Sequence, residues 1–243
     1  MKTITEEEVV ARVLARLEKD LRVNLHAHPL IVSIDRGDLL IEGEVESVAA
    51  KKRALEVAAA TPGVNGILDR IRVAPSEWMG DGEILSHVID EFVFESSLVT
   101  CGLKAWRRDE LITVRPIPPD GRGSITVRVE DGVVTLDGDI PSLTQKRLAE
   151  SLAWWIPGTR DVVNGLGVEP YEEDSDAEIV DALEVVFDKD PLLKGTRIFA
   201  TSRERVVTLV GTVRSDAQRE AAEEDAWALF GVDCVVNELA VAP

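Results

Sequence analysis

The sequence predicts an α+β fold made of three tandem α-β-β-α-β units, each a small mixed sheet with two helices on one face. Three observations lead to this prediction. A short strand pattern centred on a glycine occurs three times, a second glycine follows each of these at the same distance, and an alanine-rich stretch lies between the two. Repetition at a fixed spacing indicates several copies of one structural unit.

The three copies align without gaps on their central glycines. The strand segments 39–45, 134–140 and 207–213 contain Gly43, Gly138 and Gly211 at the same position. The glycines that follow are Gly63, Gly158 and Gly231. A serine lies four residues after each central glycine, at Ser47, Ser142 and Ser215. We therefore divide the chain into units at 1–76, 77–170 and 171–243.

Each unit begins with a predicted amphipathic helix that starts with acidic residues, over 5–20, 81–94 and 175–188. Carboxylates suit the positive end of a helix dipole. Two strands follow, joined at Arg36-Gly37, Asp131-Gly132 and Arg203-Glu204. Asp-Gly is typical of a two-residue hairpin turn, whereas Arg-Glu is not, so the third turn is expected to differ in type.

A second helix and a last strand complete each unit. The shared serine caps this helix, and the second glycine lies just past its end, where a positive φ is expected. Alanines eleven and fifteen residues after the central glycine let the helix lie close to the sheet. In the first unit they are Ala54 and Ala58, and Thr61 completes the stripe.

The charge of the chain excludes one class of partner. The net charge is −18, distributed as −1, −7 and −10 over the three units. A strongly acidic surface repels phosphate backbones, so nucleic-acid binding is not expected. Any contact with anionic lipid is expected through the first unit or the basic insertion described below, and not through the third unit.

The sequence contains no secretory leader and no apolar run long enough to span a membrane. The chain as given therefore predicts a cytoplasmic protein, and a periplasmic one if a leader was removed. Cys101 and Cys234 lie in different repeats and are expected to be reduced thiols.

The repeat resembles the BON domain family, named for bacterial osmotic-stress and nodulation proteins. The resemblance lies in the glycine-x-valine of Gly43/Val45 and its counterparts, the alanine-rich helix, and the Gly-Val pairs at Gly63 and Gly231. A closing Asn/Asp-x-Leu/Ile-x-Val, as in 164–168, completes it. The resemblance implies small non-enzymatic modules that bind phospholipid or membrane surfaces and serve envelope integrity. It also leaves open a soluble cytoplasmic sensor of a small ligand or a cation such as potassium.

No pattern of residues predicts catalysis. There is no nucleophile elbow, no phosphate-binding loop and no set of metal ligands, so no enzyme activity, cofactor or metal is expected. His26 and His28 would share one face of a strand, but no third ligand is placed beside them. The acidic run 169–178 is interpreted as a solvated linker with a helix start.

Candidate binding residues lie where the copies differ. The second unit carries an insertion near 96–122 that is locally basic and includes Trp106, Arg107 and Arg108. Within it, 111–114 is expected to add an edge strand. Long loops in compact domains are often functional.

Tryptophans on the second helices are the other difference between the copies. Trp154 and Trp227 lie sixteen residues after the central glycine, which is 140° from the core stripe, and Trp155 is also off the core. We expect at least two of these three rings at an interface between units or chains. The predicted partners are a phospholipid membrane surface or another protein, and the sequence leaves the oligomeric state open.

Overall fold

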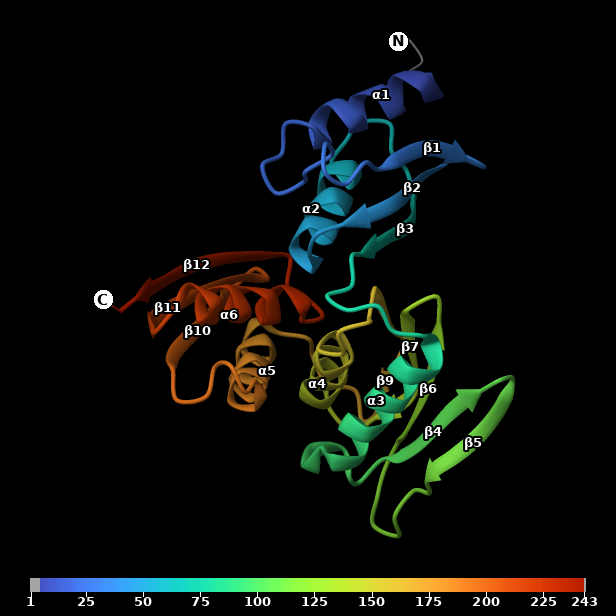
Figure 1. Cartoon of the computed structure of the whole chain (residues 1–243), viewed down its shortest axis with the longest axis vertical. Coiled ribbons are helices and arrows are strands. Elements are labelled where there is room, and N and C mark those ends of the chain that lie inside the picture. Colours follow the sequence, from blue (N-terminus) through green and yellow to red (C-terminus); the bar gives the residue numbers. More distant parts are fainter. Residues whose placement is uncertain (1–4, 243) are drawn as a thin grey trace. The chain divides into compact units, whose positions relative to one another are not determined.

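A computed structural model describes residues 5–242, which contain six α-helices and twelve strands arranged in three sheets (Figure 1). The chain separates into two compact parts, residues 1–74 and 75–243. The second part contains two of the three sheets. The α+β class and the three tandem units expected from the repeats are confirmed.

The first part contains one three-stranded sheet with two helices. Its elements are α1 (Glu6–Leu17), β1 (Ile31–Asp35), β2 (Asp38–Val45), α2 (Val48–Ala59) and β3 (Ile67–Val73). The central strand β2 is antiparallel to β1 and parallel to β3. Both helices contribute fully buried side chains to the core of the unit. They are Val13 and Leu17 on α1, and Ala54 and Ala58 on α2.

The second unit has the same plan with an added hairpin. Its elements are α3 (Asp81–Phe94), a 3-10 turn η1 (Ser96–Leu98), β4 (Gly102–Arg107), β5 (Glu110–Arg115), β6 (Ser124–Glu130), β7 (Val133–Ile140), α4 (Leu143–Trp154), β8 (Asp161–Asn164) and β9 (Gly167–Val168). The sheet order is β5-β4-β6-β7-β8, with β9 also paired to β7. The edge strand expected over 111–114 is confirmed as β5.

The third unit returns to the simple plan. It contains α5 (Asp176–Lys189), β10 (Arg197–Arg203), β11 (Val206–Val213), α6 (Asp216–Ala228) and β12 (Cys234–Val241). Its central strand β11 is antiparallel to β10 and parallel to β12. The pairing matches that of the first unit.

The three central glycines occupy one structural position, as the alignment predicts. Gly43, Gly138 and Gly211 have φ of +139°, +119° and +140°. A Cβ atom built on them would lie 2.9, 2.0 and 2.2 Å from a carbonyl oxygen, of Pro29 just before β1, of Ser124 in β6 and of Arg197 in β10. Both the backbone angle and the close approach therefore favour glycine.

A serine cap in every unit, and an amide between strand and helix in the second and third units, hold the elements together. Ser47, Ser142 and Ser215 accept hydrogen bonds from the first turn of their helices at 3.2, 3.2 and 3.3 Å. Asn164 donates to Lys146 O at 3.0 Å, and its equivalent Asn237 donates to Arg219 O at 3.0 Å. These positions serve the fold, which leaves the non-shared positions as candidates for function.

The structure corrects the role given to one helix-ending glycine. Gly63 and Gly231 have the expected positive φ, of 102° and 89°, but Gly158 does not. A Cβ on Gly158 would lie 2.6 Å from Cβ of Met79 and 3.0 Å from Cγ1 of Ile84. Close packing, and not a positive φ, is therefore the reason for glycine at Gly158.

The third hairpin turn also differs from the prediction. It is formed by Glu204-Arg205, one residue later than expected, and both residues have positive φ, of 53° and 65°. The first two turns have the same signs, so all three turns are of one type. The Asp176 carboxylate accepts hydrogen bonds from the Glu204 and Arg205 amides at 2.8 and 2.9 Å, which stabilises this turn without glycine.

Candidate functional site

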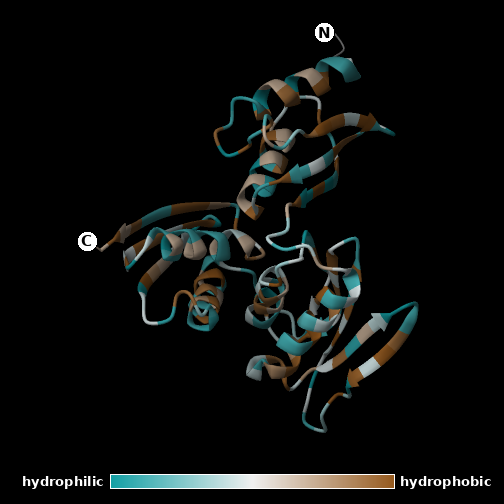
Figure 2. Cartoon of the chain, viewed as in Figure 1, coloured by the Kyte–Doolittle hydropathy of each residue, from teal (hydrophilic) through white to brown (hydrophobic). Residues whose placement is uncertain are grey.

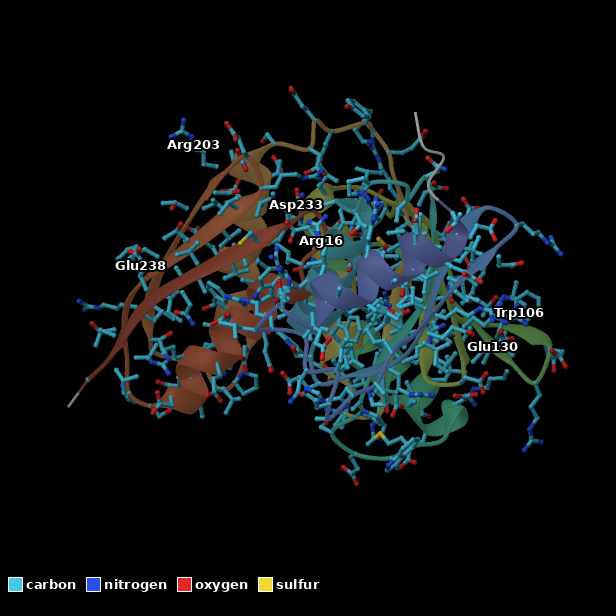
Figure 3. All side chains as sticks on the ribbon, turned by 90° about the horizontal axis from the view of Figure 1, so that it is seen from above. Arg16, Trp106, Glu130, Arg203, Asp233 and Glu238 are labelled. Carbon is cyan, nitrogen blue, oxygen red and sulfur yellow. The ribbon has the colours of Figure 1, made fainter. Side chains whose placement is uncertain are left out.

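The β4–β5 hairpin places the predicted residue Trp106 on the open side of the second sheet. Leu103 and Ala105 are fully buried, and strand alternation directs Lys104 and Trp106 to the opposite face. The Arg128 guanidinium lies 5.7 Å from the centre of the Trp106 ring. Figure 3 shows Trp106 beside the hairpin, near Glu130, which forms a 2.9 Å ion pair with Arg128.

The tip of this hairpin carries the other two predicted binding residues. Arg107 ends β4, Arg108 follows in the turn with φ of 46°, and both side chains are exposed. Leu111, opposite Trp106 on β5, is 44% exposed. Residues 102–115 carry a net charge of +2 in a unit of net charge −7. The structure therefore brings together an aromatic ring, an exposed leucine and basic side chains.

One basic residue of the insertion has a structural role. Arg115 donates to Leu98 O at 2.7 Å and to Cys101 O at 2.9 Å. These contacts fix the base of the hairpin to the turn after α3. The Arg115 guanidinium is thus engaged in contacts within the protein. The basic residues available to a ligand are those nearer the hairpin tip.

One of the three tryptophans on the second helices, Trp155, makes a contact between the second and third units. Trp155 donates from Nε1 to Asp225 Oδ1 at 2.8 Å, which joins the end of α4 to α6. Trp227 is only 2% exposed, on a helix that contacts both α4 and α5. Trp154 is half-buried. Trp155 is thus placed between units, and the interface roles of Trp154 and Trp227 stay predictions.

A buried arginine that sequence reasoning missed joins the same two units. Arg147 on α4 is fully buried and donates from Nε to Phe230 O at 2.9 Å. It also forms an ion pair with Asp174, which pairs with Arg205 at 2.9 Å. The acidic run 169–178 is exposed or half-buried and leads into α5, as expected, but it is more than a linker because Asp174 links cations from both units. Glu172 of the same run accepts from the Leu143 amide at 2.7 Å.

A second ion pair crosses the junction at its other end. Glu95, which follows α3, is 7% exposed and lies 2.7 Å from Nζ of Lys189 at the end of α5. Burial alone would raise the pKa of Glu95. The hydrogen bonds from Lys189 and Ser97 outweigh it, so this pKa is lowered and Glu95 is charged.

Asp225 is a buried carboxyl group at this junction. It is 5% exposed, and burial raises its pKa to about 8, although the Trp155 hydrogen bond opposes the rise. The negative charges of Asp190 and Glu224 raise it further. The sequence did contain a signal for Asp225, because the equivalent residues Val57 and Leu152 are aliphatic and buried. A carboxyl at an aliphatic position indicates a polar contact made by that copy alone.

No metal centre is found in the part of the chain that the structure describes, since no three histidine, cysteine or acidic side chains group as ligands there. His26 and His28 lie in turns between α1 and β1, not on a strand as considered from sequence. Cys101 and Cys234 are free thiols. None of the described helices is long and apolar enough to cross a bilayer.

Comparison with known proteins identifies the family. The profile of the BON domain matches residues 5–75, 117–170 and 175–243. The chain belongs to the BON domain family. The second match begins after the β4–β5 hairpin, so this hairpin lies outside the part of the unit that resembles other BON domains.

One curated BON-type relative is Osmotically-inducible protein Y of Escherichia coli strain K12. It is 31% identical over 144 residues, which are 59% of this chain and 63% of the relative. The chain thus matches somewhat less than two thirds of the length of that relative.

Two solved structures of CdsD, a structural protein of the type III secretion system of Chlamydia trachomatis, also match. Each is 11% identical with a TM-score of 0.25, and they cover 99% and 97% of this chain and 100% and 93% of the CdsD chains. A likeness this low supports no inference about the BON protein.

Proposed function

We propose that this BON protein is a non-catalytic module that binds phospholipid membrane surfaces through the β4–β5 hairpin, in a response to osmotic stress. The observation that carries the proposal is the grouping of Trp106, Leu111 and exposed arginines on one hairpin of an otherwise acidic protein. The osmotic-stress role rests on the family and on the name of the Escherichia coli relative.

The chemistry of the hairpin suits the boundary between lipid headgroups and water. Tryptophan is enriched at this boundary because its ring is apolar and its N–H is polar. Each basic side chain near an anionic surface contributes about 1 kcal/mol, and this contribution falls with added salt. Arg128 lies near the Trp106 ring, Lys104 is on the same face of β4, and Arg107 and Arg108 are exposed at the adjoining tip. The exposed Leu111 adds apolar area.

The sharpest test is co-sedimentation of the full chain with vesicles of neutral lipid, with and without anionic lipid. We expect binding to the anionic vesicles only, weakened by salt. Trp106→Ala should weaken binding, and the double variant Arg107→Glu/Arg108→Glu should weaken it about tenfold or more, because two positive charges become negative, a change of four charge units.

The chain offers a matched control for Trp106. Trp78 is 78% exposed and lies 5.9 Å from the Arg160 guanidinium, so it has a similar arginine partner away from the hairpin. Trp78→Ala should leave vesicle binding unchanged. Equal loss of binding in the Trp78 and Trp106 variants, or undiminished binding in the double arginine variant, would refute the hairpin as the contact.

A further inference from the structure

The sheet of the third unit has an open face that is unusually apolar. Helices α5 and α6 bury Val207, Leu209 and Val213 of β11, and strand alternation places Val206 and Val210 on the other face. Phe199 pairs with Val210, and Val236 lies on the same face of β12. These four side chains are 65%, 37%, 36% and 40% exposed, in the order Phe199, Val206, Val210 and Val236.

Comparison of the repeats shows that the fold does not require this apolar face. The residue before the central glycine is Glu42 in the first unit, Asp137 in the second and Val210 in the third. The residue after it is Glu44, Asp139 and Thr212. The unit with the largest negative charge has therefore lost both carboxylates from the centre of this face. Figure 2 shows the hydropathy of each residue along the three sheets.

The charges of the open face are divided between its two edges. Arg197 and Arg203 lie on the edge strand β10, and Glu238 lies on the opposite edge strand β12. Phe199, Val210 and Glu238 form one row across the sheet, and Arg197 lies one row from it. Figure 3 shows Arg203 and Glu238 projecting from the third sheet.

We propose that this face binds the same face of a second copy of the chain. A two-fold axis parallel to β11 places β10 of one copy over β12 of the other. Arg197 of each copy then lies within reach of Glu238 of its partner, and the central strands β11 lie over each other with Val206 and Val210 facing the partner. An axis perpendicular to the strands would instead place Arg197 against Arg203. The charge pattern thus selects one self-complementary arrangement, the aligned packing of two sheets.

The size of the face sets the strength of the dimer. Three strands contribute four side chains each, whereas stable interfaces use about 20–30 residues a side. We therefore expect a weak dimer that forms reversibly at micromolar concentration. The surface is separate from the β4–β5 hairpin, so the proposal does not depend on membrane binding.

Sedimentation equilibrium of the full chain, from low to high micromolar concentration, tests the proposal. The expected mass rises with concentration from 26.6 kDa towards twice that value. Val210→Glu restores the carboxylate that the other two units carry, and it should give a monomer with an unchanged circular dichroism spectrum. Val163→Glu, on the equivalent face of the second unit where Val163 is 49% exposed, should still dimerise.

The charge swap tests the arrangement of the dimer. Arg197→Glu and Glu238→Arg should each weaken association, and the double variant should restore it. A monomer at every concentration overturns the proposal, as does dimerisation of Val210→Glu or failure of the double variant to recover. A monomer whose vesicle binding is lost in Val210→Glu would assign the face to lipid and also overturn it.

Discussion

Buried ionisable residues gather where the second and third units meet. Arg147 is fully buried, and Asp225 and Glu95 are 5% and 7% exposed. Each has a partner in the other unit, because isolated buried charges are strongly disfavoured. Their environments differ, since Glu95 faces a lysine whereas Asp225 faces an indole N–H and other carboxyl groups.

Asp225 should make the stability of this part of the chain depend on pH. Its pKa is about 8 in the folded protein and near 4 when unfolded. The folded state therefore holds a proton that the unfolded state releases between these values. The stability that this group contributes is present at the acidic end and is lost as pH rises towards 8, by at most about 1.4 kcal/mol per pH unit.

Asp225→Asn tests this expectation, because the amide oxygen still accepts the Trp155 N–H but does not ionise. Urea denaturation measures the free energy of unfolding of the variant and of the native chain. The variant should become increasingly more stable than the native chain as pH rises from 5 to 8. Asp233→Asn, at an exposed carboxylate of the same unit, serves as the control. A difference independent of pH would show that Asp225 does not carry this proton.

At the scale of elements, an aspartate at the start of a helix fixes a hairpin turn in two units. Asp81 accepts from the Asp131 and Gly132 amides at 3.0 and 2.9 Å, as Asp176 does from Glu204 and Arg205. The helix start and the turn are about fifty residues apart in the second unit and under thirty in the third. Each contact ties the first helix of its unit to the end of the sheet.

Asp176→Ala should lower the melting temperature more than Asp81→Ala does. The third turn has no glycine, so two residues with positive φ depend on the Asp176 carboxylate. Thermal denaturation followed by circular dichroism measures the difference. Adding Glu204→Gly to the Asp176 variant should recover part of the loss, and no recovery would mean that strain in the turn is not the cause.

The Asp176 carboxylate should also matter in acid. Hydrogen bonds from the Ser202 hydroxyl and from the Arg205 amide lower the pKa of Asp176 below its ordinary value. Its contribution to stability is therefore present above the ordinary aspartate pKa and is lost as pH falls through the lowered one.

The elements of the fold were predictable because they repeat. Gly43, Gly138 and Gly211 marked the central strands, and the alanine stripe marked the buried side of the second helices. The contacts between the second and third units were not predictable, because each of them occurs only once in the chain. The residues equivalent to Arg147 are Lys52 and Glu220, and no pattern links Arg147 to Phe230, 83 residues away. Helix geometry predicted that Trp155 leaves its own core, but not that Asp225 accepts its N–H.

At the scale of the whole molecule, the junction makes one compact part of residues 75–243, with residues 1–74 as another. Calorimetry should therefore show two transitions, of which the larger includes both later units. Arg147→Met removes the buried guanidinium and should cost about 3 kcal/mol, by analogy with other broken buried pairs. The larger transition should then move down or split in two. Arg219→Met, at an arginine of α6 whose side chain is 43% exposed, should leave the transitions in place.

The same variant separates the stability of the junction from membrane contact. Arg147 is far in the fold from the hairpin, since it lies on α4 while the hairpin lies at the β5 edge of the second sheet. Arg147→Met should loosen the two units yet keep vesicle binding at a temperature where both remain folded. A parallel loss of binding and of the larger transition would mean that the contact with lipid needs both units.

Hydrogen–deuterium exchange of the full chain, with anionic and with neutral vesicles, tests the proposed function most directly. It reports where the chain contacts the membrane without any substitution. We predict that anionic vesicles slow amide exchange over residues 102–115, while exchange in β1, β2 and β3 is unchanged and neutral vesicles have no effect. Slowed exchange confined to other segments, or no difference between the two vesicle types, would contradict the account.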